Sequence, residues 1–388
     1  MMINKKKTGV YIHIPFCVKK CRYCDFLSFA ADESVKKEYT EALCREIRGC
    51  REEMKRADSV FIGGGTPSVL SADQTERIMY TVRENIELTP DCEITAEINP
   101  GTMNREKARI YRSCGINRIS MGVQSLDDGL LERLGRIHRK SEVYETFYLL
   151  REEGFGNINT DLMFSLPGQS IDLWEETLEG ILDLKPEHVS FYGLMIEEGT
   201  PFYDELKAGT LTETEDEKDR LMYRRALARL KSAGYRQYEI SNAAVPGRES
   251  VHNLKYWSME DYIGFGLGAH SFEKGVRYCN TGDMEEYLSI YRKIPGDREK
   301  CCSIINRNTV KDNAEEFIFT GLRKTEGILK ADFKKITGMS IEAVYSGEIR
   351  KMSEEGLLRD TGDSICLTER GTDFSNYVMR EFIKEEEW

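Results

Sequence analysis

Three cysteines lie close together near the start of the chain and could bind a metal. Cys17, Cys21 and Cys24 follow the spacing C-x3-C-x2-C, and Asp25 and Phe26 stand where a fourth thiol could have come. Thiolates bind soft metals, so the two candidates are Zn²⁺ and an iron–sulfur cluster. A closed structural zinc site takes a fourth ligand, usually from a second Cys or His pair, and no such pair is visible downstream. The spacing therefore favours a [4Fe–4S] cluster with one iron open to a small molecule over zinc.

Two further groups of residues that could bind a ligand follow along the chain. In the turn GGGTP, residues 63–67, the glycines let the backbone approach a ligand and can offer N–H groups to its carboxylate. The same motif also serves as a plain strand-to-helix turn. Glu97, in AEINP, is suited to a ligand's ammonium or ribose, or is a solvated charge at a strand end. Both groups are therefore candidates for a binding site.

Alternating β-rich and helical segments must position these groups. Amphipathic segments such as residues 33–55 and two segments that open with a capping Ser separate the β-rich runs. Six β-α units in a row predict a parallel sheet with right-handed crossovers, either open or curled into a barrel. Periodicity does not choose between these two forms. The predicted strands are residues 9–14, 59–64, 93–99, 118–123, 158–165 and 188–196.

The candidate groups share one edge of this predicted sheet. The cysteines come just after the first strand, GGGTP comes just after the second, and Glu97 and Asn99 end the third. In open and closed parallel sheets alike, ligands bind at the carboxyl ends of the strands. The order of motifs therefore predicts a single site at this edge.

The C-terminal part has a different pattern. A long charged helix at 213–233 precedes an aromatic and glycine-rich region at about 235–282 and a linker-like stretch near 295–310. The pattern then predicts helices at about 312–323, 329–337 and 341–355, two strands around a turn within 356–371, and a final helix. This order indicates a winged-helix-like module or a plain helical appendage. The expected divisions are 1–235, 236–305 and 306–388.

Composition narrows the class of protein. The 388 residues are 40% hydrophobic and 31% charged, as in a soluble globular protein, and exceed the usual size of one domain. A net charge of -12 argues against binding to nucleic acid. No apolar run is long enough to predict a signal peptide or a membrane-spanning helix. Eleven irregularly spaced cysteines do not suit a disulfide scaffold, so we expect a reducing cytoplasm.

C-x3-C-x2-C after the first strand and GGGTP after the second resemble the radical S-adenosylmethionine superfamily. The resemblance implies a partial (β/α)6 barrel followed by the winged-helix-like domain. It also implies one [4Fe–4S] cluster per subunit at Cys17, Cys21 and Cys24. S-adenosylmethionine would bind the open iron through its amino and carboxylate groups.

Further motifs narrow the resemblance. YIHIPFC, GGGTP, EINP, GVQS, LGR and NTDLMFSLPGQ are similar, in order over residues 8–270, to the oxygen-independent coproporphyrinogen III oxidase family. The match implies that Tyr11 and Tyr23 flank the cluster and leaves room for a second S-adenosylmethionine. Judged by residue type alone, Arg136 could be an ordinary helix surface charge. The residues that the resemblance assigns to S-adenosylmethionine are Gly64, Gly65, Thr66, Glu97, Gln124, Arg136 and Asp161.

Two features separate the branches of this family. The oxidases resemble C-x3-C-x2-C-x-C, whereas Phe26 occupies the fourth position here. HNLKYW, residues 252–257, resembles the HNxxYW signature of the heme-chaperone branch and implies His252 as the heme ligand. His270, in GFGLGAHS, is a reserve candidate. A histidine beside aromatic residues is also a common structural residue.

The resemblance therefore favours a cytoplasmic heme chaperone that passes the porphyrin to an acceptor protein, with a respiratory, membrane-associated protein as one candidate. The first alternative is an enzyme that oxidatively decarboxylates coproporphyrinogen III. The second is a zinc-bound interaction protein whose C-terminal module makes the contact. The cleavage of S-adenosylmethionine, the oligomeric state and the mode of heme attachment stay open.

Overall fold

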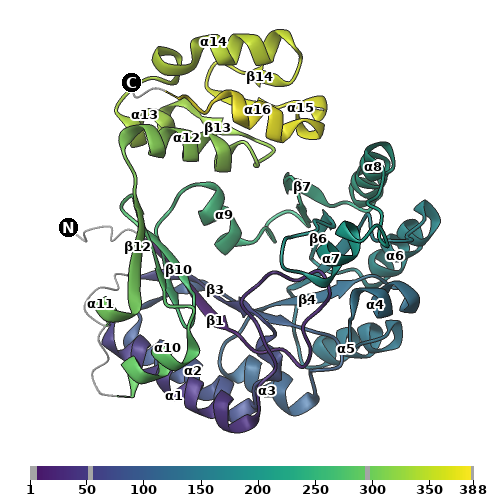
Figure 1. The fold of residues 1–388 in the computed structure, drawn as a ribbon, viewed down its shortest axis with the longest axis vertical. Coiled ribbons are helices and arrows are strands. Elements are labelled where there is room, and N and C mark those ends of the chain that lie inside the picture. The colour runs from purple at the N-terminus through teal and green to yellow at the C-terminus, as the bar shows by residue number, and fades with distance from the viewer. Residues whose placement is uncertain (1–6, 51–55, 293–297, 386–388) are drawn as a thin grey trace.

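A computed structural model describes residues 7–50, 56–292 and 298–385. Its centre is a large sheet in which six parallel strands follow one another in chain order (Figure 1). The strands are β1 (Thr8–Ile14), β2 (Ala57–Gly64), β3 (Leu88–Ile98), β4 (Arg118–Gln124), β5 (Ile158–Phe164) and β6 (His188–Gly193). All six predicted strands are confirmed, with ends that differ by a few residues.

Helices connect these strands on the outer side of the sheet. Ser71 and Gln74 form a reciprocal capping box at the start of α2, and Ser170 caps α6, as the two opening serines predicted. The predicted helix at 33–55 ends at Gly49, and its last positions, 51–55, lie outside the described residues. The helices are α1 (Glu33–Gly49), the short turn η1 (Pro67–Val69), α2 (Ala72–Asn85), α3 (Arg105–Ser113), α4 (Asp128–Leu134), α5 (Lys140–Glu152) and α6 (Ile171–Leu184).

The sheet curls into a partial barrel. Side chains from both ends of the six-strand series, Tyr11 of β1 and Ser190 of β6, line the same interior cavity, and each of the four strands between them adds at least one residue. A flat sheet would hold these side chains far apart. The prediction of an α/β partial barrel is therefore confirmed. Of the two forms that periodicity left open, the sheet has the curled one.

Short strands extend the barrel at both ends. On the far side of β1 come β9 (Tyr262–Phe265), β10 (His270–Glu273), β11 (Val276–Asn280) and β12 (Cys302–Arg307), and beyond β6 come β8 (Asn242–Ala244) and β7 (Arg236–Glu239). The described part of the stretch expected to be a linker instead forms α11 (Arg298–Cys301) and β12. Backbone pairing with β11 orders it, although most of its side chains are exposed. The alternation that marks a half-buried strand is therefore missing.

The C-terminal region forms its own core around Phe317, Phe333 and Tyr345. Its helices α12, α13 and α14 and its three-stranded antiparallel sheet match the expected winged-helix-like pattern. Figure 1 shows α9 (Val251–Trp257) between this region and the barrel, and α9 contacts both α12 and β2. The region comprises α12 (Val310–Gly321), β13 (Ile328–Leu329), α13 (Lys330–Thr337), α14 (Ile341–Glu354), β14 (Leu358–Asp360), β15 (Ser364–Leu367), α15 (Glu369–Asp373) and α16 (Ser375–Glu381).

The remaining helices are α7 (Pro201–Lys207), α8 (Asp216–Ser232) and α10 (Met284–Tyr291). The predicted charged helix at 213–233 corresponds to α8. Within the described part of the chain, every helix is too short or too polar to cross a membrane.

One buried carboxylate ties the strand extension to the barrel. Glu46 of α1 is 1% exposed and accepts hydrogen bonds from Gly266 N at 2.8 Å, Asn280 Nδ2 at 2.6 Å and Tyr287 Oη at 2.6 Å. These donors come from three segments after β9. Burial raises the pKa of Glu46, and the three donors oppose that rise.

We predict that Glu46→Ala lowers the free energy of unfolding by about 3–5 kcal/mol, because three buried donors lose their acceptor. Urea denaturation monitored by circular dichroism measures the change. Glu38→Ala, at an exposed position of the same helix that pairs with Arg292, is the matched control and should cost about 0–1 kcal/mol. Equal, small losses for both variants would contradict the role of Glu46.

Candidate functional site

The three clustered cysteines lie in the loop between β1 and α1 and line one cavity of about 140 Å³. Each thiol is free and partly exposed. The loop is anchored at its start by Cys17 N, which donates to Phe29 O at 3.0 Å, and in its middle by Arg22 N, which donates to Leu134 O at 3.0 Å. Three potential soft-metal ligands thus open into a single space.

The glycine-rich turn lies against this loop and lines the same cavity through Gly64, Gly65 and Thr66. Gly65 N donates to Ile14 O at 2.9 Å, and Thr66 N donates to Phe16 O at 2.7 Å. Gly64 has a φ of 107°, a conformation that favours glycine. The two loops are therefore joined backbone to backbone at the carboxyl ends of β1 and β2.

Glu97, at the end of β3, points into the cavity from the third strand. Its Oε2 accepts a hydrogen bond from Gly64 N at 3.0 Å. Burial, together with the nearby carboxylate of Asp161, raises the pKa of Glu97 to about 8. A carboxyl group in this state can take up a cationic ligand group, which would replace the proton.

We predict that the stabilising effect of Glu97→Gln in the cofactor-free protein grows with pH. Because the folded pKa of about 8 lies above the ordinary value of 4.5, the folded state holds more protons between these pH values. The stability of the natural protein therefore falls as pH rises through this window, by an amount on the order of 5 kcal/mol, and then levels off. Gln does not titrate.

Urea denaturation at about pH 5 and about pH 9 measures this difference between Glu97→Gln and the natural protein. Glu145→Gln, at an exposed position of α5, controls for the loss of a surface charge. A stability difference that stays constant or shrinks with rising pH would contradict the buried, protonated state of Glu97.

Arg136 brings a cation to the cysteines. It follows α4, and its Nη2 donates to Asn99 Oδ1 and to Gly122 O, each at 2.5 Å, while Nη1 lies 3.7 Å from Cys21 Sγ. The interpretation of Arg136 as an ordinary surface charge is therefore wrong, because the guanidinium lines the cavity. The guanidinium therefore places a positive charge beside one of the three candidate metal ligands.

Gln124 and Asp161 complete the wall of this cavity. Gln124 ends β4 with a φ of 67°, and its Oε1 accepts from Tyr192 Oη at 3.2 Å. Asp161 accepts from Asn159 Nδ2 at 2.7 Å and from Ser120 Oγ at 3.1 Å, and burial raises its pKa. Tyr23 also lines the cavity, and burial raises its pKa.

The donor set fits an iron–sulfur cluster with a small zwitterionic ligand. Thiols face the cavity, the glycine-rich turn leaves no room for side chains at Gly65, and the partly buried Glu97 has no cation partner among the described ion pairs. Such a wall supplies ligands for iron, close backbone approach and a counter-charge for an ammonium group.

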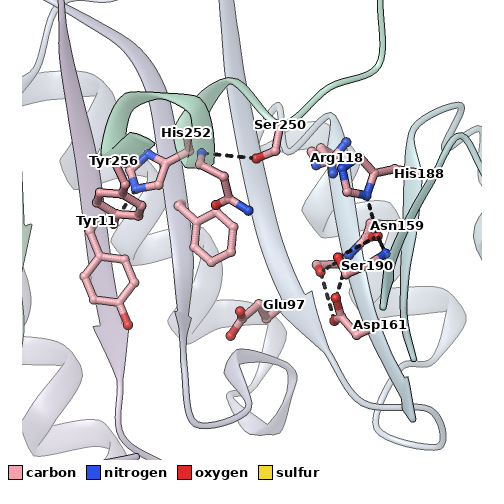
Figure 2. Close-up of a pocket in the computed structure, with 13 residues that line it drawn as sticks. Tyr11, Glu97, Arg118, Asn159, Asp161, His188, Ser190, Ser250, His252 and Tyr256 are labelled. Carbon is pink, nitrogen blue, oxygen red and sulfur yellow. Dashed lines mark hydrogen bonds between the residues drawn. The ribbon is translucent and has the colours of Figure 1, made fainter. Parts of the chain in front are cut away.

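A second cavity, of about 250 Å³, lies next to the first. Glu97, Ser120 and Asp161 line both. Figure 2 shows His252 and Tyr256 of α9 at one end of this second cavity and Glu97 and Asp161 at the other. Tyr11, expected to flank the cysteines, lies in this second cavity, where its Oη is 2.9 Å from His13 Nδ1.

His252 is enclosed and has both ring nitrogens in hydrogen bonds. Nδ1 lies 2.9 Å from Ser59 Oγ, and Nε2 lies 2.9 Å from Tyr256 Oη. The residue is 1% exposed, and burial lowers its pKa to about 3. In this conformation neither nitrogen is open to an iron atom, so the geometry is that of a structural histidine which fastens α9 to β2.

Several lining residues are absent from the candidates that the motifs single out. Besides Asp161, polar side chains occupy most of the alternate positions of the buried strands β4, β5 and β6 that face the barrel interior, with Gly122 and Met163 as the exceptions. This period of two within apolar strands is the sequence signal that could have identified them. The residues are Arg118, Ser120, Asn159, His188, Ser190 and Tyr192.

Known proteins resemble the chain over nearly its whole length. A family model described as the radical SAM superfamily matches residues 11–181, and one described as the HemN C-terminal domain matches residues 308–374. A protein of Bacillus subtilis named heme chaperone HemW is 36% identical and aligns over 97% of this chain and 99% of its own length. The protein of that name from Lactococcus lactis is 35% identical over 98% of this chain and 99% of its own length.

A solved structure shares the fold. Coproporphyrinogen III oxidase (HemN) from Escherichia coli, described as a radical SAM enzyme, superposes with a TM-score of 0.84 at 21% identity. The match covers 97% of this chain and 90% of that one. The partial barrel and the C-terminal region therefore occur together in that protein as well.

Proposed function

This chain belongs to the HemW family of the radical S-adenosylmethionine superfamily, and from that membership we propose that it is a cytoplasmic heme chaperone. It would bind heme and pass it to an acceptor protein, and it would carry a [4Fe–4S] cluster with an exchangeable S-adenosylmethionine. The observation that carries the proposal is the near full-length identity to proteins named heme chaperone HemW.

Cys17, Cys21 and Cys24 would hold the cluster, since they are the three thiols that line the first cavity. When bound, such a cluster supplies an open iron and an electron. Arg136, 3.7 Å from Cys21 Sγ, would offset part of the negative charge of the thiolates.

S-adenosylmethionine would lie along the wall that the glycine-rich turn and Glu97 form beside the cysteines. The backbone of Gly64 and Gly65 allows close approach by its carboxylate, and Glu97 offers a counter-charge to its ammonium or a hydrogen bond to its ribose. Gln124, Arg136 and Asp161 line the same cavity. Tyr11 lies beyond Glu97, where a second molecule could lie.

Phe26 favours carrying a porphyrin over making one. It stands where the oxidases resembled by the sequence have a fourth cysteine, and it is 62% exposed beside the cavity. A large apolar side chain held in solvent suits contact with a flat apolar ligand.

Heme transfer from the reconstituted full chain to an apo heme protein of the respiratory chain tests this function. The expected result is movement of the Soret absorption to the acceptor and a gain of the acceptor's activity, at a rate above that of free heme. Incubation with coproporphyrinogen III, S-adenosylmethionine and a reductant tests the oxidase. Formation of protoporphyrinogen without heme transfer would overturn the proposal.

A further inference from the structure

Imidazole is a common protein ligand of heme iron, so the state of each histidine decides which can serve. The chain has five histidines, and the structure describes them all. Four are between 1% and 7% exposed, and each has at least one ring nitrogen in a hydrogen bond: His13, His138, His188 and His252. None of these four offers an accessible, free nitrogen to a porphyrin.

His270 is the exception. It begins β10, its side chain is exposed, and it makes no side-chain hydrogen bond within the described residues. Burial of part of the ring and the nearby guanidinium of Arg277 lower the pKa of His270, which favours the neutral imidazole that binds iron. An exposed, neutral imidazole without a hydrogen-bond partner is free to bind a metal ion.

The hairpin around His270 offers a second soft group. Cys279 of β11 lies directly opposite His270 in the antiparallel register, so the two side chains leave the same face of the sheet. Phe272 and Arg277 form the next pair on this face, with the guanidinium 5.0 Å from the ring centroid. The face therefore carries an exposed imidazole and a partly exposed thiol, while the ring of Phe272 is buried beneath Arg277.

The cysteine loop supplies apolar surface beside this hairpin. Leu27 packs on the start of the hairpin, because its Cδ2 lies 2.5 Å from the point that a Cβ of Gly268 would occupy. Leu27 O is also 2.9 Å from the ring of His13, whose pKa the neighbouring His270 helps to lower. Phe26 and Leu27 are 62% and 38% exposed. Leu27, an exposed apolar residue, thus lies at the start of the hairpin that carries the exposed imidazole, and Phe26 precedes it in the loop.

We propose that heme binds in the angle between the β10–β11 hairpin and residues 26–27 of the cysteine loop, with His270 as the iron ligand. This inference rests on the proposed heme-chaperone function and names the site. The cavity beside His252 measures about 250 Å³, below the range of about 300–1,000 Å³ that drug-sized ligands occupy, and a porphyrin is larger than most of these. The open face at His270 sets no such limit.

This position has a consequence for the cofactors. Phe26 and Leu27 follow Cys24 after one intervening residue, Asp25, so heme at this site would lie next to the cluster loop. Binding of S-adenosylmethionine or loss of the cluster would alter the loop that covers one face of the heme.

Heme titration of the cluster-loaded full chain tests the site. His270→Ala is expected to weaken heme binding at least tenfold and to remove the imidazole-type ferric spectrum in electron paramagnetic resonance, and added free imidazole should restore that spectrum. His252→Ala and Cys279→Ser are expected to keep the spectrum. Lys274→Asn, at an exposed position of the same hairpin, is the matched control. Iron and sulfide content shows that each variant is folded.

The outcomes separate this inference from the proposed function. If the natural protein binds and transfers heme while His270→Ala keeps its affinity and spectrum, His270 is not the ligand and the chaperone function stands. If His252→Ala alone abolishes the spectrum, the iron lies in the cavity beside α9 and not at the hairpin. If Cys279→Ser alone abolishes it, the thiol and not His270 is the iron ligand. If the natural protein takes up no heme, both proposals are overturned.

Discussion

Cys21→Ala should leave the reconstituted protein without its iron–sulfur cluster, seen as loss of iron, sulfide and the broad absorption near ~400 nm typical of such clusters. Cys21 is one of only three thiols that line the cavity, and its sulfur is the one that contacts Arg136. A cluster already held by three ligands cannot lose one and stay bound against chelators. The binding of S-adenosylmethionine should fall as well, because the open iron is lost.

Cys366→Ala is the control for removal of a thiol. Cys366 is 2% exposed and packs in the C-terminal region, so its loss should cost about 1 kcal/mol of stability and leave the iron content unchanged. Full iron content in Cys21→Ala would contradict the three-cysteine site. A colourless natural protein with stoichiometric zinc would contradict the cluster itself.

Gly65→Ala should weaken S-adenosylmethionine binding by roughly 100-fold, equivalent to about 2.7 kcal/mol. A Cβ at this position would lie 2.7 Å from Phe16 O and 2.8 Å from Ile14 O. These are backbone atoms, so no side-chain rotation relieves the contact. The glycine-rich turn must then separate from the strand end that carries the cysteine loop, and both walls of the cavity shift.

Calorimetry or equilibrium dialysis with the cluster-loaded protein measures this loss of affinity. Gly156→Ala is the matched control, because a Cβ there meets no atom within 4 Å and the same atom group is added. If the affinity of Gly65→Ala for S-adenosylmethionine lies within a few-fold of the natural value, close contact between the glycine-rich turn and the cysteine loop is not required for binding.

Local patterns were enough to predict the β-α alternation and the edge at which the site forms. Strand and helix periods depend on neighbours along the chain, and a parallel sheet places all strand ends of one kind together. The positions of Cys17, Gly65 and Glu97 around one cavity follow from that rule alone. The strand β12 was not predicted, because most of its side chains are exposed and buried and exposed residues do not alternate along it.

The tertiary structure decided what single residues can do. Arg136 and Cys21 are 115 positions apart, and only the packing of the loop after α4 brings the cation to the thiol. The sequence by itself determined the type and order of the chemical groups in HNLKYW and GFGLGAHS. It did not determine that Ser59 and Tyr256 occupy both nitrogens of His252 while His270 stays open. Burial and hydrogen-bond partners depend on contacts between distant segments, and these decide whether a histidine is structural or available to a ligand.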